Sequence, residues 1–157
     1  MPLSGSDPYR LDRIVLATDF SSASRTATGY AVALGKANRS TLTVAHVRTH
    51  EEQICDEQRL RRSLHELVPE LKNADFAAVV LDGDPVRALS NHARTEHADL
   101  IVMGIKQASR AATMFGEGVA HEVICRAECP VFTIAQKKRE VHAVRPAFIE
   151  EIAGTLV

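Results

Sequence analysis

The sequence has little cysteine, few aromatic residues and no long apolar stretch. Three cysteines (Cys55, Cys125 and Cys129) are an odd number in a chain of 157 residues, which argues against a disulfide framework and favours a reducing compartment. Five Phe, two Tyr and no Trp are few for a surface that stacks on bases or sugars. No apolar run approaches the roughly 20 residues that cross a bilayer, and none near Met1 resembles a signal peptide. We therefore expect a cytoplasmic protein without membrane contacts.

The sequence also lacks an excess of charge of either sign. Nineteen basic and twenty acidic residues give a formal net charge of −1. Such a balance argues against binding to naked nucleic acid or to an anionic membrane. With 45% hydrophobic and 25% charged residues, the composition is that of a folded globular chain, and the length suits one domain.

Short apolar segments alternate with segments of helical periodicity. The expected strands are 14–17, 41–47, 76–81, 100–103 and 131–135. The expected helices begin near residues 21, 51, 84 and 119. Continuous apolar runs suit strands that are covered on both faces. The alternation therefore predicts an α/β fold, with a doubly wound, open parallel sheet and helices on both faces.

Several residues mark the ends of these helices. Ser21 and Ser22 are candidate N-caps, and Asp84 followed by Pro85 is a strong helix start. The second helix is expected over 51–72, with Pro69 ending or kinking it. The expected organisation is a flexible lead-in (1–10), one domain (11–136) and a C-terminal extension (137–157) whose apolar residues are compatible with a short helix.

Two expected strand ends carry residues that suit ligand binding. Asp19 follows the first strand, and Gly104 follows the fourth. Open parallel sheets bind ligands at the carboxyl ends of their strands, where the strand order reverses. The segment 104–118 contains three glycines and the cations Lys106 and Arg110, and it leads into a helix start. It is either a phosphate cradle or a plain connecting loop; it matches neither a Walker loop nor GxGxxG.

Five stretches, taken together, point to one family. They are RIVLATDFSSAS (13–24), HV (46–47), GDPVRAL (83–89), ADLIVMG (98–104) and VAHEVICRAECPVFTIA (119–135). In their order and spacing the sequence resembles the universal stress protein family. The resemblance implies a five-stranded sheet of order 3-2-1-4-5 and a dimer that is often formed through the last strands. One branch of that family binds ATP, and another does not.

The ATP-binding branch has Gly-x-x-Gly, nine residues, then Gly-Ser or Gly-Thr. Here Gly104 occupies the first position, but Gln107 occupies the second, Glu117 the third and Gly118 that of the hydroxyl. A one-residue deletion would instead place Gly116 third and Glu117 in the hydroxyl position. Either alignment breaks the motif in at least two of its four positions.

These departures predict weak ATP binding. A Glu117 carboxylate about 4 Å from a phosphate charge costs on the order of 4 kcal/mol at an effective dielectric near 20, which is roughly a thousandfold in affinity. Lys106 and Arg110 would offset part of this cost, and a bridging magnesium ion would reverse it. The resemblance also implies that Asp19 meets the nucleoside and that the backbone of Val47 meets the base. Asp19 is equally suited to cap the following helix.

Two functions follow, and the sequence leaves both open. The first is a dimeric regulatory protein that acts through contacts with an unidentified protein partner and binds no ATP tightly. Its expected interface is the last strand, with Val131, Phe132, Thr133 and Ile134. The second is a sensor that binds ATP or AMP, with or without magnesium, in the crevice between Asp19 and the segment 104–118. We expect no enzymatic activity, since no side-chain constellation supports even a slow ATPase.

No metal site is expected either. His46 and His50 are four residues apart and precede Glu51 and Glu52, a spacing that holds a metal on a helix. However, His46 falls in an expected strand and His50 in a loop, where a solvated histidine is the simpler interpretation.

Overall fold

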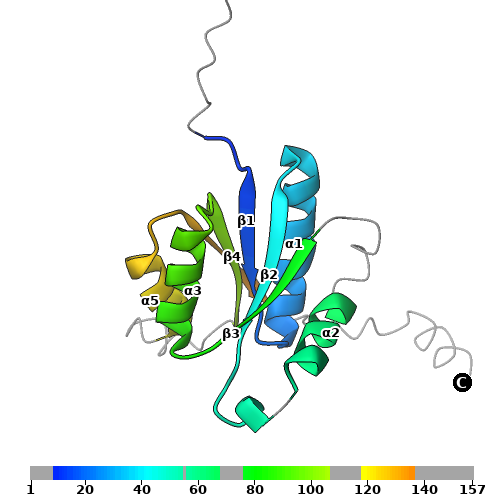
Figure 1. Cartoon of the computed structure of the whole chain (residues 1–157). Coiled ribbons are helices and arrows are strands. Elements are labelled where there is room, and N and C mark those ends of the chain that lie inside the picture. Colours follow the sequence, from blue (N-terminus) through cyan, green and yellow to red (C-terminus); the bar gives the residue numbers. More distant parts are fainter. Residues whose placement is uncertain (1–8, 55, 68–75, 107–117, 137–157) are drawn as a thin grey trace, which may run out of the picture.

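The computed structural model describes residues 9–54, 56–67, 76–106 and 118–136. Its strands are β1 (Arg13–Ala17), β2 (Thr41–Val47), β3 (Phe76–Leu81), β4 (Leu100–Lys106) and β5 (Val131–Gln136). All adjacent pairs are parallel, in the order β3-β2-β1-β4-β5. This confirms the predicted sheet, and it places the reversal of strand order between β1 and β4 (Figure 1).

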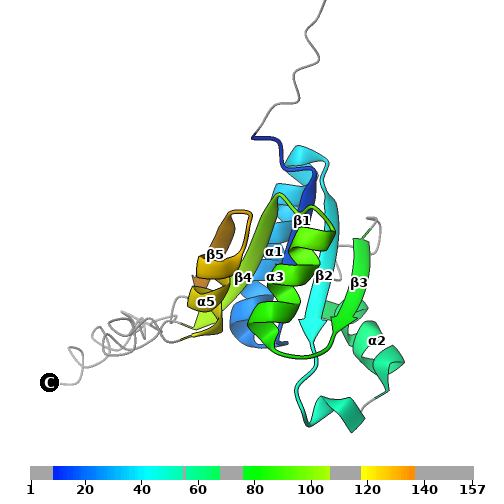
Figure 2. The same ribbon diagram turned by 60° about the vertical axis from the view of Figure 1, so that its left-hand side comes forward.

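Helices cover both faces of the sheet (Figures 1 and 2). On one face lie α1 (Ser22–Asn38) and α2 (Glu57–Leu67), and on the other lie α3 (Pro85–Thr95) and α5 (Val119–Arg126). β1 shows why its sequence is apolar throughout: Ile14 and Leu16 join the core under α1, whereas Val15 and Ala17 join the core under α3 and α5. The central strands thus bury both of their faces, as the continuous apolar runs predicted.

The expected caps position the helices that border the sheet ends. Ser21 Oγ accepts a hydrogen bond from Ser24 N at the start of α1. Asp84 Oδ1 accepts one from Arg87 N at 2.9 Å, and Pro85 is the first residue of α3. Each cap satisfies a backbone N–H that lacks a partner within its helix.

The single helix predicted over 51–72 is wrong at its start. The chain forms a short 3₁₀ helix, η1 (Glu52–Ile54), and α2 begins only at Glu57. Thr49 and Glu52 form a reciprocal capping box, since each backbone N–H donates to the side chain of the other residue. Asp56 Oδ1 then accepts from Gln58 N and starts α2 separately. The predicted helix end at Pro69 lies outside the described residues.

Other predictions also fall outside the part of the chain that the structure describes: those for residues 1–8, for the segment 107–117 and for the extension 137–157. Among the described helices, none is both long enough and apolar enough to cross a membrane.

Candidate functional site

A cavity of about 680 Å³ opens at the carboxyl ends of β1, β2 and β4. Its volume is within the usual range for small-molecule sites. Its polar wall comes from the turn after β1, which includes Asp19 and Ser21. Leu89 of α3, Met103 of β4 and Ile124 of α5 supply an apolar wall. The cavity therefore lies where the reversal of strand order predicted a ligand site.

Asp19 holds its carboxylate at the mouth of this cavity. Its Oδ1 accepts a hydrogen bond from Ser21 N at 2.9 Å, within the turn that precedes α1. Burial raises the pKa of Asp19, but hydrogen bonds from Ser21 and Ser24 outweigh burial and leave the pKa below its usual value. The carboxylate is thus ionised at neutral pH. The alternative role of Asp19 as the N-cap of α1 is wrong, because Ser21 is the cap.

Gly104 lines the cavity, yet the surrounding packing gives it a second role. β4 passes so close to the first turn of α1 that a Cβ atom on Gly104 would lie 2.2 Å from the carbonyl oxygen of Ala23 and 2.6 Å from Ser24 N. These are backbone atoms and cannot move aside alone. Glycine is therefore required here for the approach of helix to strand.

Another part of the cavity lining is suited to an anion. Gly118 is the N-cap of α5 and makes no side-chain capping hydrogen bond, so the N-cap residue itself offers no acceptor to the first N–H groups of α5. Lys106, at the end of β4, and His121, in the first turn of α5, line the cavity together with Gly118. Helix N-termini with nearby cations bind phosphates and carboxylates. Of the predicted cradle, Gln107, Gly116 and Glu117 lie outside the described residues.

Val47 also lines the cavity. β1 pairs with β2 only as far as Ala17 and Ala45, and Val47 is two residues further along β2. On its other edge, β2 is still paired with β3 at this position, where Val47 is in register with Leu81. The backbone of Val47 therefore borders the cavity beyond the last paired residue of β1.

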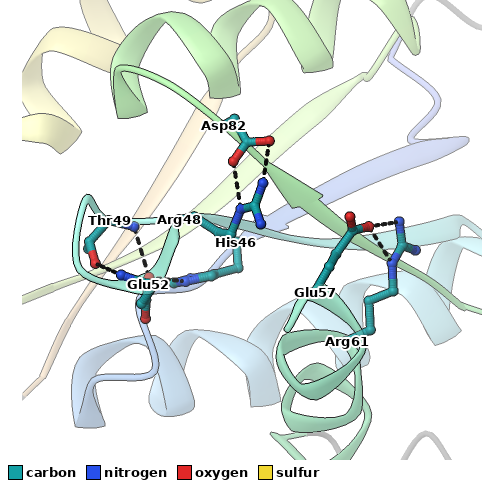
Figure 3. Close-up of polar contacts among 7 residues, drawn as sticks. All are labelled: His46, Arg48, Thr49, Glu52, Glu57, Arg61 and Asp82. Atoms are coloured by element: carbon teal, nitrogen blue, oxygen red, sulfur yellow. Dashed lines mark hydrogen bonds and ion pairs between the residues drawn. The ribbon is translucent and has the colours of Figure 1, made fainter. Parts of the chain in front are cut away.

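Sequence reasoning missed a buried contact between two lining residues, His46 and Glu52 (Figure 3). His46 is only 3% exposed, which rules out the solvated histidine for this position. Its Nδ1 lies 2.8 Å from the carbonyl oxygen of Thr18, and its Nε2 lies 2.9 Å from Glu52 Oε2. Burial raises the pKa of Glu52, but the N–H of Thr49 and the contact with His46 outweigh burial and hold this pKa below its usual value. The Thr-x-x-Glu pattern at 49–52 was the signal in the sequence.

The described residues contain no group of three or more His, Cys, Asp or Glu side chains arranged to hold a metal ion.

The predicted interface strand, β5, lies at one edge of the sheet. Phe132 is 41% exposed, and its ring meets that of Tyr30 on α1 edge to face, with centroids 6.4 Å apart. Ile134 is buried in the core under α1, Val131 packs on the opposite face, and Thr133 lines the cavity. Phe132 is therefore the side chain of the four that β5 leaves most open to a partner.

A comparison with known families and structures agrees with this architecture. The model of the universal stress protein family matches residues 10–135. No curated protein matches the sequence significantly. A universal stress protein from Archaeoglobus fulgidus is 25% identical, with a TM-score of 0.68; the match covers 83% of this chain and 46% of that one.

Two further structures contain nucleotides. A universal stress protein in complex with cAMP is 20% identical, with a TM-score of 0.64, and the match covers 80% of this chain and 97% of that one. A family protein from Arabidopsis thaliana with AMP bound is 15% identical, with a TM-score of 0.59, and the match covers 85% and 97% of the two chains. At these identities the likeness extends to the fold alone.

Proposed function

Because this chain belongs to the universal stress protein family, we propose that it is a stress-response regulator whose cavity binds a nucleoside monophosphate, AMP or cAMP, and binds ATP only weakly. One observation carries the proposal: the same cavity is lined by an ionised carboxylate, Asp19, and by an anion-binding helix start, that of α5. This lining matches a ligand that carries both hydroxyl groups and a phosphate.

The lining residues support this ligand class. The Asp19 carboxylate can accept hydrogen bonds from ribose hydroxyls, since ionised acceptors make the stronger hydrogen bonds. The N-terminus of α5, Lys106 and His121 suit one phosphate group. Gly118 supplies no hydroxyl where ATP-binding relatives have serine or threonine, and this favours ligands with fewer phosphates. The relatives with cAMP and AMP support the same ligand class.

Calorimetry on nucleotide-stripped protein tests this function. We expect AMP or cAMP to bind at micromolar concentration, and ATP to bind roughly 100-fold more weakly, which is about 2.7 kcal/mol. Each titration is run with and without magnesium, because a bridging cation would rescue ATP selectively. If no nucleotide gives a binding signal at millimolar concentration, the proposed nucleotide binding is wrong. If ATP binds as tightly as AMP, the proposed preference for ligands with fewer phosphates is wrong.

The second candidate function is that of a dimeric interaction protein, and the edge strand favours it. Among the described strands, none pairs with the outer edge of β5, which also carries the exposed ring of Phe132. Such an edge invites pairing with a second chain. We propose that two copies pair through β5 and that the dimer is the form that meets a protein partner.

Replacing Phe132 with serine is expected to weaken this dimer about tenfold, because a half-exposed aromatic ring contributes on the order of 1–2 kcal/mol when it is covered. Sedimentation velocity over a concentration series measures the change. Ile54→Ser is the matched control, since Ile54 is 92% exposed on η1, away from β5, and its loss should leave dimerisation unchanged. A wild-type protein that stays monomeric at micromolar concentration contradicts the interface.

A further inference from the structure

We infer that His46 is a buried imidazolium, held by the Glu52 carboxylate, and that it is a positioning residue for Asp19 in the cavity. The assignment of charge rests on the contacts of the two ring nitrogens and does not depend on the proposed function. The positioning role rests on the proposed nucleotide binding, because Asp19 is the group it positions.

Both ring nitrogens of His46 face hydrogen-bond acceptors, and Figure 3 shows the contact with Glu52. The carbonyl oxygen of Thr18, 2.8 Å from Nδ1, can only accept, so Nδ1 carries a proton. Nε2 then meets Glu52 Oε2 at 2.9 Å, and this oxygen already accepts from Thr49 N at 2.8 Å. A neutral ring would direct its lone pair at a carboxylate oxygen. A second proton on Nε2 turns that repulsion into a charge-assisted hydrogen bond.

Among the described residues, the charged groups around the ring leave Glu52 as its partner. Burial raises the pKa of Glu52, but its hydrogen bonds outweigh burial and hold the pKa below its usual value, which favours the carboxylate form. Asp19, in the turn after β1, directs its Oδ1 at Ser21 N. The remaining charged groups nearby pair elsewhere: Arg48 with Asp82, and Glu57 with Arg61. On β3, the residue in register with His46 is the uncharged Val80.

His46 supports Asp19 from both sides along the chain. Thr18, before Asp19, gives its carbonyl oxygen to Nδ1. Phe20, after Asp19, packs its ring against the imidazole at an interplanar angle of 50°, with centroids 4.5 Å apart. Phe20 has a φ of 61°, a left-handed conformation that is uncommon for a non-glycine residue. The contact with the buried ring and the hydrogen bond from Phe20 N to Thr18 Oγ1 both support this conformation, which sets the turn that presents Asp19.

The ring itself lies on the far side of the sheet from the apolar wall of the cavity. Side chains alternate along a strand, so His46 shares a face with Leu42 and Val44, which pack under α1. Ala45 and Val47 face α3 and α5. His46 and Glu52 are among the residues that line the cavity, but His46 is only 3% exposed and both of its ring nitrogens are engaged by Thr18 and Glu52. Its role in the site is therefore to hold the turn that presents Asp19.

The experiment compares the wild type with Glu52→Gln by ¹⁵N NMR of the histidine rings, amide hydrogen exchange and AMP titration. Glutamine has the size of glutamate but no charge. Because Oε2 of Glu52 contacts both Thr49 N and His46 Nε2, the glutamine amide has to turn so that its oxygen accepts from Thr49 N and its NH2 group donates to Nε2 of a neutral ring. We expect both His46 nitrogens to be protonated at pH 7 in the wild type and only Nδ1 in the variant. The amides of Phe20 and Ser21 should exchange about fivefold faster in the variant, and AMP should bind about fivefold more weakly. Glu51→Gln, the same change at the exposed preceding residue, should alter none of these.

The three readouts separate the possible failures. A wild-type ring with a single proton at pH 7 overturns the imidazolium assignment. The positioning role is overturned if the wild-type ring is doubly protonated and Glu52→Gln makes it neutral, but neither the amide exchange nor the AMP affinity changes. If the wild type binds no AMP, the proposed nucleotide function fails, whereas the ring spectrum and the exchange of Phe20 and Ser21 still decide whether His46 is charged and orders the turn.

Discussion

Alanine at position 104 is expected to destabilise the protein severely, by about 3 kcal/mol or more. The added Cβ would overlap the backbone of Ala23 and Ser24, with separations down to 2.2 Å. Overpacking in a core typically costs 1–3 kcal/mol even where side chains can yield, and here the opposing atoms are the first turn of α1. To relieve the overlap, α1 would have to move off β4 near Asp19, so any fold that survived would also have a distorted cavity.

Urea unfolding followed by circular dichroism measures this effect, and Gly29→Ala is the control. Gly29 lies in the exposed middle of α1, where an added Cβ meets nothing within 4 Å. Alanine there should raise stability by roughly 0.5–1 kcal/mol, the usual advantage of alanine over glycine in a helix. A Gly104→Ala protein as stable as the wild type would mean that α1 and β4 lie further apart than described.

The second large effect is expected at Asp19. Replacing it with alanine should weaken AMP binding roughly 10- to 150-fold, the equivalent of about 1.5–3 kcal/mol for hydrogen bonds to a charged group. Asn at the same position keeps an acceptor for Ser21 N but removes the charge, so Asp19→Asn should lie between the wild type and alanine. The titration is the same calorimetric one.

Asp56 offers a control of the same local geometry. Its Oδ1 accepts from the N–H two residues ahead, as that of Asp19 does, but Asp56 precedes α2 and does not line the cavity. Asp56→Ala should lower stability slightly and leave AMP affinity unchanged. If Asp19→Ala bound AMP as tightly as Asp56→Ala does, the carboxylate would not meet the ligand, and the proposed contact with the ribose would have to be reassigned.

Local patterns in the sequence were enough to predict most of the fold. The strand over Phe76–Leu81 has the predicted bounds, and Ser21 and Asp84 start their helices as expected. These features depend on residues within a few positions of one another. The start of α2 was mistaken because the leucine periodicity does not reveal that Asp56 begins a new helix after η1.

The candidate site was only partly predictable, because its decisive contacts join distant segments. The place of Asp19 at a strand end followed from topology. The close approach of Gly104 to Ala23 spans some 80 residues and needs the packed helix to be visible. His46 and Glu52 stood out in the sequence, but nothing in the spacing indicated that the imidazole lies buried and contacts the carboxylate.

The strand order has a consequence for how the protein is made. β4 pairs directly with β1, although α1, β2, α2, β3 and α3 separate them along the chain. While the polypeptide emerges from the ribosome, one edge of the apolar strand β1 has no strand to pair with until residues 100–106 have been made. Such long-range parallel pairing closes slowly, and exposed apolar edges attract other nascent chains. Substitutions that delay the docking of β4 should therefore lower the yield of soluble protein more than their effect on the finished fold would suggest.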